Sequence, residues 1–260
     1  MAAPTWLNGA FGAARLSPAE CAWSTHATIW LMNGRDNATP FPAARYDAHV
    51  ERTIPYYASF HEETFQLVGT IASAPAVWLD TGCGTGNLVE KALPLFPATR
   101  FLLADPSSAM LDQARAKLAG AGSDRIVFLD AAGSRDLALG PVRCDVITAI
   151  QCHHYLDREG RRAAVGACYR LLAEGGLFVC FENIRPTSAR AVEIGKEYWK
   201  AYQVRQGKPR HEAAAHIERF DREFFPLTVT EHLDLLRESG FQTAELFWYS
   251  YMQAGFFAIR

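Results

Sequence analysis

The sequence predicts an α/β fold built on a mostly parallel β-sheet, and three features of the chain support this prediction. Short apolar runs alternate with amphipathic stretches of helical spacing through the middle of the chain. A glycine-rich turn follows the first of these apolar runs. Residues 243–260 contain two further β-type runs joined by a short turn. Alternating strands and helices are typical of βαβ units, whose parallel sheet is covered by helices on both faces.

Composition and charge narrow the class of protein. The chain has 260 residues, of which 49% are apolar and 21% are charged, as in ordinary globular domains. Lys and Arg number 26 against 28 Asp and Glu, so no strong positive field marks a nucleic-acid partner. No apolar run is long enough to cross a bilayer, and the first residues lack a signal-peptide pattern. The six cysteines form no CxxC pair, which is typical of reduced thiols. We therefore expect a cytoplasmic protein that neither enters a membrane nor binds nucleic acid, and that could form a homodimer.

The expected elements follow in order along the chain. Apolar runs predict strands at 76–80, 100–105, 125–130, 144–150 and 177–183, and helical spacing predicts helices at 87–96, 107–120, 157–176 and 228–241. Serines cap the second of these helices and Asp157 caps the third, which a Gly pair is expected to end. The last helix has a capping-box-like start at Thr230, although Glu231 is out of register with it. The two runs in 243–260 predict an antiparallel pair at the sheet edge.

Two segments lie outside this alternating pattern. Residues 1–75 have helical character and many aromatic side chains, and predict an N-terminal helical cover. Residues 184–227 are polar with scattered aromatics, and predict a helical lid inserted into the domain that spans residues 76–260. We expect both segments to cover the carboxyl ends of the strands, where open α/β sheets bind their ligands.

The strongest motif is VWLDTGCGTGNL at 77–88, in which Gly82, Gly84 and Gly86 follow a strand and precede a helix. Such glycines permit a tight turn and a close approach of the backbone to a ligand. A dinucleotide-binding GxGxxG motif needs a third glycine at position 87, where this chain has Asn, and no Lys-Ser/Thr pair marks a phosphate-binding loop. The loop therefore favours a ligand without a pyrophosphate group.

Acidic side chains end three successive predicted strands beside this loop. Asp80 ends the first, Asp105 the second and Asp130 the third, where Ala131 leaves room for a flat base. A carboxylate about twenty residues beyond a glycine loop can accept hydrogen bonds from both hydroxyls of a ribose. One such acid is commonly just a cap, but three in register with the loop predict a ligand site.

The motifs LDTGCGTG, LLADPSSAML, VFLDAA and YRLLAEGGLFVCFE resemble those of class I S-adenosylmethionine-dependent methyltransferases, from about residue 45 to the last residue. The resemblance implies a Rossmann-like, seven-stranded sheet that ends in the predicted hairpin, and S-adenosylmethionine as the cofactor. It implies that the loop packs on the methionyl part, Asp105 holds the ribose, Met110 and Asp130 hold the adenine, and Asp80 orients the ammonium group. The expected cofactor-binding residues are Tyr57, Asp80, Gly82, Cys83, Gly84, Asp105, Pro106, Met110, Asp130, Ala131 and Gln151.

A narrower resemblance lies towards both ends of the chain. RYDAHVERTIPYYASFHEETF and LTVTEHLDLLRESGFQTAELFWYSYMQAGFFAIR are similar to the family that contains carboxy-S-adenosylmethionine synthase of tRNA wobble-uridine modification. This similarity implies that Tyr57 contacts the cofactor. Two departures favour an ordinary methyl donor. The synthase loop lacks the glycine that Gly84 supplies here, and Arg219 and Arg222 are out of register with the arginine that binds the synthase's extra carboxylate.

The run AIQCHHYLD at 149–157 follows the fourth strand, where the resemblance places the reactive methyl group. Consecutive residues cannot easily converge on one ion, and no HxxxH or CxxC partner exists, so we predict no metal. A histidine can instead accept a proton from the acceptor during transfer, and His154 is preferred to His153 for this role. The alternative is that both histidines only hold the loop through hydrogen bonds to the backbone.

Further residues are candidates for contact with the acceptor. Glu182 and Asn183 end the fifth strand, with Glu182 as a third catalytic candidate, and Tyr155, Trp199 and Tyr202 are candidate substrate residues. Trp199 and Tyr202 could equally pack the lid on the core. The resulting hypothesis is methyl transfer to a small molecule. The alternatives are carboxy-S-adenosylmethionine synthesis or tRNA wobble-uridine modification, and a regulator that binds the cofactor without catalysis.

Overall fold

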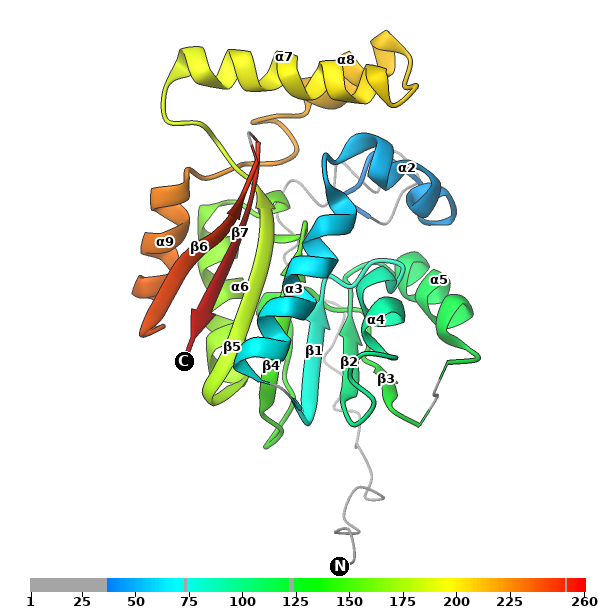
Figure 1. Cartoon of the computed structure of the whole chain (residues 1–260), viewed down its shortest axis with the longest axis vertical. Helices are drawn as coiled ribbons and strands as arrows, with labels where there is room; N and C mark the ends of the chain where they lie inside the picture. Colours follow the sequence, from blue (N-terminus) through cyan, green and yellow to red (C-terminus); the bar gives the residue numbers. More distant parts are fainter. Residues whose placement is uncertain (1–36, 73, 122–123, 251) are drawn as a thin grey trace, which may run out of the picture.

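The computed structural model describes residues 37–72, 74–121, 124–250 and 252–260. Its centre is a seven-stranded sheet with the strand order β3-β2-β1-β4-β5-β7-β6. The strands are Val77–Thr81 (β1), Arg100–Ala104 (β2), Ile126–Phe128 (β3), Cys144–Ile150 (β4), Leu172–Asn183 (β5), Thr243–Tyr249 (β6) and Gln253–Ile259 (β7). The first five pair in parallel, and β7 runs antiparallel between β5 and β6 (Figure 1). The predicted fold class and the C-terminal antiparallel pair are confirmed.

Helices cover both faces of this sheet, and further helices lie at one end of its parallel strands (Figure 1). They are Tyr46–Thr53 (α2), Tyr57–Ile71 (α3), Asn87–Ala92 (α4), Ser108–Leu118 (α5), Arg158–Leu171 (α6), Ala189–Arg205 (α7), Arg210–Glu218 (α8) and Val229–Glu238 (α9), with the 3-10 turns Ala43–Arg45 (η1), Ser134–Asp136 (η2) and His153–Tyr155 (η3). Residues 184–227, called the lid below, contain α7 and α8. The lid and α2 lie at the carboxyl ends of the parallel strands (Figure 1). None of the helices in the described residues combines the length and apolar character that crossing a bilayer requires.

The sheet separates two apolar cores, because successive side chains of a strand point to opposite faces. Trp78 of β1 packs in the core that contains residues of α3, α4 and α5, whereas Leu79 packs in the core that contains residues of α6 and α9. Phe60 of α3 stacks on Phe181 of β5 with 4.6 Å between ring centroids. These contacts hold α3 on a face of the sheet, and among the described residues of the expected cover α2 and residues 39–41 lie towards the carboxyl ends of the strands. The first 36 residues of the expected N-terminal cover lie outside the described residues.

The boundary between α6 and β5 differs from the prediction. Asp157 caps α6 as predicted, since its carboxylate accepts a hydrogen bond from Gly160 N at 2.7 Å. The helix ends at Leu171, however, and the Gly pair at 175–176 belongs to β5. Leu172 pairs with Cys144 of β4, and Gly175 N donates a hydrogen bond to the Arg260 carbonyl at 2.9 Å. Pairing with neighbouring chain segments therefore overrides the local helical pattern.

Other predicted boundaries were also wrong by a few residues. The capping box of α9 was predicted at Thr230 but is complete on Thr228, the first residue of the predicted range, and the helix ends at Glu238, three residues earlier than predicted. Thr228 Oγ1 accepts from Glu231 N at 3.2 Å, and the Glu231 carboxylate accepts from Thr228 N at 2.9 Å. Glu231 is thus in register with the true cap. In addition, α4 ends at Ala92 and β3 at Phe128, each earlier than predicted.

Candidate active site

The glycine loop connects β1 to α4 at the carboxyl edge of the sheet. Its three alternating glycines have φ values between 55° and 79°, a region that glycine adopts without steric cost. A Cβ on Gly82 would lie 2.5 Å from the Cβ of Cys152, so the loop packs directly on the segment that follows β4. The amides of Gly82 and Cys83 both donate to the Ala104 carbonyl, at 2.8 and 3.0 Å. The loop is therefore held between β2 and the histidine run.

Asp105 follows β2 and is bonded to the glycine loop itself. Its carboxylate accepts hydrogen bonds from Gly84 N and Ser107 N, both at 2.9 Å. Ser107 in turn caps α5 by accepting from Met110 N at 3.0 Å, as the sequence predicted for a serine. Asp105 and Met110 are buried, whereas Pro106 is exposed. These bonds fix the carboxylate beside the loop.

Asp80 is buried within β1. Thr148 of the neighbouring strand β4 donates its hydroxyl to Asp80 Oδ1 at 2.7 Å, and Trp78 Nε1 donates to the same hydroxyl at 3.0 Å. Burial raises the pKa of the Asp80 carboxyl to about 7, with a smaller contribution from the charge of Asp105. A carboxyl with such a pKa gains free energy from a cationic ligand, because the ligand favours its charged form.

Asp130 and Ala131 differ from the predicted geometry. Both are exposed, and Asp130 lies beyond the last residue of β3, Phe128. The prediction that Asp130 ends the third strand was therefore wrong by two residues, whereas its expected contact with the adenine stays a prediction. The segment still adjoins the site, because Ala132 N donates to the Asp105 carbonyl at 3.2 Å.

Polar bonds join α2 to the glycine loop. The Asp47 carboxylate accepts hydrogen bonds from Thr85 Oγ1 at 2.6 Å, Asn87 Nδ2 at 2.9 Å and Lys117 Nζ at 2.6 Å. These bonds hold α2 over the loop at the start of α4. Asp47 was not among the site residues predicted from the sequence, although it lies within the RYDAHVER motif.

Two tyrosines adjoin the acids, Tyr46 at the start of α2 and Tyr57 at the start of α3. Tyr57, a predicted cofactor residue, is buried at the start of α3 and its hydroxyl is hydrogen-bonded to that of Tyr46. Burial raises the pKa of Tyr57 to about 12 and that of Tyr46 well above its usual value. The charge of Asp80 acts on Tyr57 and that of Asp105 on Tyr46, so both hydroxyls adjoin the acidic side of the site. Tyr46 was not predicted from the sequence.

Glu182, at the end of β5, organises the histidine run. Its fully buried carboxylate accepts three hydrogen bonds, from His153 N at 3.1 Å, His154 N at 2.9 Å and His154 Nδ1 at 2.7 Å. Burial alone would raise the pKa of Glu182, but the hydrogen bond and charge of His154 lower it to about 2. Burial lowers the pKa of His154. A charged carboxylate only accepts, so the neutral His154 ring carries its proton on Nδ1 and a lone pair on Nε2.

His153 is engaged at both its ring and its backbone. Its Nε2 lies 2.8 Å from Ser134 Oγ, which lies 2.8 Å from Thr81 Oγ1. Arg161 Nε donates to the His153 carbonyl at 3.0 Å. Burial lowers the pKa of His153 to about 4. These contacts favour the holding role for His153 that the sequence left open, and they make His154 the better candidate base.

A pocket opens between the carboxyl ends of β4 and β5 and the lid. It is lined by Thr39, Pro40, Phe41, Tyr46, Val50, Thr53, Ile54, Gln151, Tyr155, Asn183, His216 and Phe224. Gln151 has an uncommon φ of 56°, and neither polar atom of its buried side chain has a partner among the described residues. The buried Oδ1 of Asn183 is likewise unpartnered there. Buried amides are normally satisfied, so two such groups in one pocket indicate a site for a polar ligand.

Trp199 and Tyr202 lie outside the lining of this pocket. Trp199 is buried, and its Nε1 donates to the Thr53 carbonyl at 2.7 Å. The Tyr202 hydroxyl donates to the Glu51 carbonyl at 2.9 Å. Both residues therefore join α7 to α2, which corresponds to the packing alternative for this pair.

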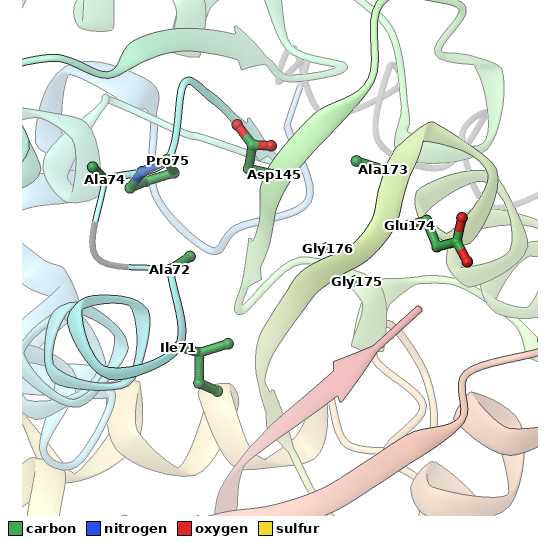
Figure 2. Close-up of a pocket in the computed structure, with 9 residues that line it drawn as sticks. All are labelled: Ile71, Ala72, Ala74, Pro75, Asp145, Ala173, Glu174, Gly175 and Gly176. Carbon is green, nitrogen blue, oxygen red and sulfur yellow. The ribbon is translucent and has the colours of Figure 1, made fainter.

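A second hollow lies near the amino ends of β1, β4 and β5 (Figure 2). It is lined by Ile71, Ala72, Ala74, Pro75, Asp145, Ala173, Glu174, Gly175 and Gly176. Its Asp145 carboxylate already accepts from Ala76 N and Val77 N, at 2.7 and 2.9 Å. Open α/β sheets bind ligands at the carboxyl ends of their strands, which favours the pocket beneath the lid. Within the described part of the chain, no three His, Cys, Asp or Glu side chains gather as a metal site.

Comparisons with known proteins identify the sequences that this chain resembles. Residues 79–178 match the family model of a methyltransferase domain. The carboxy-S-adenosyl-L-methionine synthase of Campylobacter lari is 28% identical over 207 residues, which cover 78% of this chain and 85% of the synthase. The synthase of Methylococcus capsulatus is 27% identical over 222 residues, which cover 84% of this chain and 90% of that protein.

Solved structures show the same fold. An O-methyltransferase family protein from Burkholderia thailandensis matches with a TM-score of 0.54 and 14% identity, covering 90% of this chain and 70% of that one. The S-adenosylmethionine-dependent methyltransferase SibL matches with a TM-score of 0.54 and 17% identity, and the match covers 93% of this chain and 71% of the SibL chain. The shared fold, the family match and the relatives together support a class I S-adenosylmethionine-dependent methyltransferase similar to carboxy-S-adenosylmethionine synthases.

The raised pKa of Asp80 predicts a pH-dependent stability. Between the usual pKa of 3.8 and the folded value of about 7, the folded protein keeps a proton that the unfolded chain releases. The contribution of Asp80 to the free energy of unfolding therefore falls as the pH rises through this window. Asp80→Asn cannot ionise, so it should lose this part of the slope and be stabilised relative to wild type above pH 7.

Urea denaturation at about pH 5 and about pH 8 would measure this difference. Asp112→Asn is the matched control, because the Asp112 side chain is 73% exposed on α5. The control should follow the wild-type pH dependence. Parallel slopes for Asp80→Asn and wild type would contradict the prediction.

Proposed function

We propose that this methyltransferase transfers the methyl group of S-adenosylmethionine to a small-molecule acceptor bound in the pocket beneath the lid. The observation that carries the proposal is the composition of that pocket, whose lining includes Gln151 and Asn183; both polar side-chain atoms of Gln151 and the Oδ1 of Asn183 lack a partner among the described residues. An enclosed pocket suits a small molecule better than a folded RNA. The formal net charge of −2 supports the same choice.

The glycine loop and the acids beside it fit the sulfonium cofactor S-adenosylmethionine. The loop offers a close backbone approach, and Asp105 offers a fixed carboxylate for the ribose hydroxyls. The buried carboxyl of Asp80 would gain its charge beside a cationic ligand. We place the adenine towards Met110 and the exposed Asp130 segment. When bound, S-adenosylmethionine supplies an electrophilic methyl group on a positively charged sulfur.

His154 is the proposed base that takes a proton from the acceptor. Its Nε2 lone pair is available because Glu182 holds the Nδ1 proton. The Glu182 carboxylate would stabilise the imidazolium that forms on His154. A buried Asp carboxylate does the same for the histidine of a Ser-His-Asp triad. His154 adjoins the pocket through Tyr155, a lining residue whose ring centroid is 4.3 Å from that of His154.

A second candidate function is favoured by Arg219. Its side chain is buried in the lid, 5.8 Å from the ring centroid of Phe224, whereas Arg222 is exposed. Arg219 donates to the Glu223 carboxylate at 2.8 Å and to the Ala38 carbonyl at 2.6 Å. A buried guanidinium near the pocket could accommodate a carboxylated donor. The second candidate is thus synthesis or use of carboxy-S-adenosylmethionine, the activity named for the relatives.

The cofactor site is tested by Asp105→Ala. We expect its affinity for S-adenosylmethionine to fall by about a hundredfold or more, because one carboxylate would serve two ribose hydroxyls. Isothermal titration calorimetry measures the affinity, and a thermal unfolding curve checks that the variant is folded. Asp112→Ala, at an exposed position of α5, should bind like wild type. Equal affinity for wild type and Asp105→Ala would refute the assignment.

The catalytic role of His154 is tested by His154→Asn. The Asn amide can still donate to Glu182 but has no counterpart of the Nε2 lone pair, so transfer should slow by about 10²–10⁴-fold. Cofactor affinity should not change. The readout is single-turnover formation of S-adenosylhomocysteine with the best acceptor from a screen of phenols, carboxylates and amines.

His153→Gln is the control, because its amide can replace the hydrogen bond to Ser134. It should transfer at close to the wild-type rate. A wild-type rate in His154→Asn would leave His154 with a packing role only.

The two candidate functions are separated by mass spectrometry of small molecules released from the freshly purified protein. We expect S-adenosylmethionine or S-adenosylhomocysteine. The carboxylated form would establish the second candidate instead. Asp105→Ala, purified in parallel, should release much less of either ligand. If wild type releases no adenosyl compound and also fails to bind S-adenosylmethionine by calorimetry, both candidates are wrong.

A further inference from the structure

The lid contains a buried chain of hydrogen bonds that the proposed transfer step does not use. Lys208 Nζ donates to Gln203 Oε1 at 2.9 Å, and Gln203 Nε2 lies 2.9 Å from His216 Nδ1. The three residues are 9%, 0% and 6% exposed, respectively. Gln203 comes from α7 and His216 from α8. Because His216 also lines the acceptor pocket, the chain runs from the interior of the lid to the proposed acceptor.

The chemistry of these groups determines where each proton lies. An ammonium group can only donate, so the amide atom that Lys208 contacts must be the carbonyl oxygen of Gln203. The other end of the amide is then an NH2 group, which also only donates. His216 Nδ1 must therefore accept. A neutral imidazole that accepts at Nδ1 carries its proton on Nε2.

The surroundings of His216 oppose any other protonation state. Burial lowers its pKa well below the usual value, and the charges of Lys208 and Arg219 lower the pKa further. The ring packs edge-on against Trp199, at 5.1 Å between centroids, and nearly parallel to Phe224, at 6.0 Å. An imidazolium would also set an Nδ1–H against the amide protons of Gln203. The ring is therefore neutral and fixed in orientation.

We infer that His216 binds the acceptor by donating its Nε2–H to a lone pair on it, and that Lys208 and Gln203 are positioning residues that hold this tautomer. The inference rests on the proposed function, because it assumes that the acceptor occupies the pocket beneath the lid. Nδ1 is already engaged, so Nε2–H is the hydrogen-bonding group that the ring can offer to a ligand.

The charges around the pocket narrow the class of acceptor. No Asp or Glu occurs among the described residues that line it. The Lys208 ammonium lies 5.0 Å from the ring centroid of Phe41 and donates to Thr53 Oγ1 at 3.2 Å, and both of these residues line the pocket. Arg219 lies above Phe224, a further lining residue. With aromatic walls and cations nearby, the pocket fits a flat acceptor that presents oxygen lone pairs and is neutral or anionic.

The tautomer can be tested without any ligand, by long-range ¹H–¹⁵N correlation spectra of the ¹⁵N-labelled full chain. His216→Phe identifies the His216 signals by their loss. We expect an unprotonated Nδ1 and a protonated Nε2 at neutral pH. In Gln203→Glu the carboxylate can accept from both Lys208 and His216, so Nδ1 should become protonated. Gln206→Glu adds the same charge at an exposed position of the lid and should change nothing.

A protonated Nδ1 in wild type would overturn the inference. So would identical His216 signals in wild type and Gln203→Glu. Neither result depends on cofactor binding, so failure of this inference is distinguishable from failure of the proposed function, which calorimetry with S-adenosylmethionine tests separately.

The class of acceptor is tested with benzoate and benzylamine as probes, which share a ring but differ in charge. Each is titrated into the protein saturated with S-adenosylhomocysteine. Benzoate should bind and shift the His216 Nε2 signal, whereas benzylamine should not. His216→Phe should weaken benzoate binding about tenfold while the affinity for S-adenosylhomocysteine stays unchanged. Equal binding of the two probes, no binding of benzoate to wild type, or unaltered benzoate affinity in His216→Phe would contradict the inference.

Discussion

The buried carboxylate of Glu182 holds the turn on which the candidate base lies. The turn η3 is three residues long, and its first amides would lack partners without an external acceptor. Glu182 accepts two of these amides and the Nδ1–H of His154. The same group thus satisfies the backbone, orients the imidazole and stays ionised because its three donors compensate for burial. An apolar residue at this position would leave three buried donors unpaired.

Contacts spread from this turn to the lid. Arg161 of α6 donates to the His153 carbonyl at 3.0 Å and to the Phe225 carbonyl at 2.6 Å. Phe225 N donates in turn to the His154 carbonyl at 2.7 Å. The segment by which the lid returns to the sheet is therefore bonded to the turn that carries His154. The position of the lid and that of the candidate base are set by shared hydrogen bonds, so a displacement of one would strain the other.

Parts of the site could be predicted from the sequence because they depend on a short stretch of chain. Asp105 follows the glycine loop after one helix and one strand, so its distance along the chain identified it. The start of β5 was missed because Leu172 acquires its conformation from Cys144, a partner in another strand. Likewise nothing in the local pattern distinguishes buried Gln203 from exposed Gln206. The bond from Gln203 to His216 joins two helices, and contacts between elements leave no periodic trace in the sequence.

The two sides of the candidate site differ in charge, and this difference assigns opposite roles to similar side chains. Asp80 and Asp105 lie at the glycine loop, whereas Lys208 and Arg219 lie in the lid. A cationic donor is favoured on the first side and a neutral or anionic acceptor on the second.

His154 and His216 both pack on Phe224, each with 6.0 Å between ring centroids. A carboxylate accepts the Nδ1 proton of His154, which leaves Nε2 able to take a proton. An amide donates to Nδ1 of His216, which leaves Nε2 able only to donate. The partner behind each ring therefore suits one imidazole to the proposed role of base and the other to that of hydrogen-bond donor, and exchanging those partners would exchange the proposed roles.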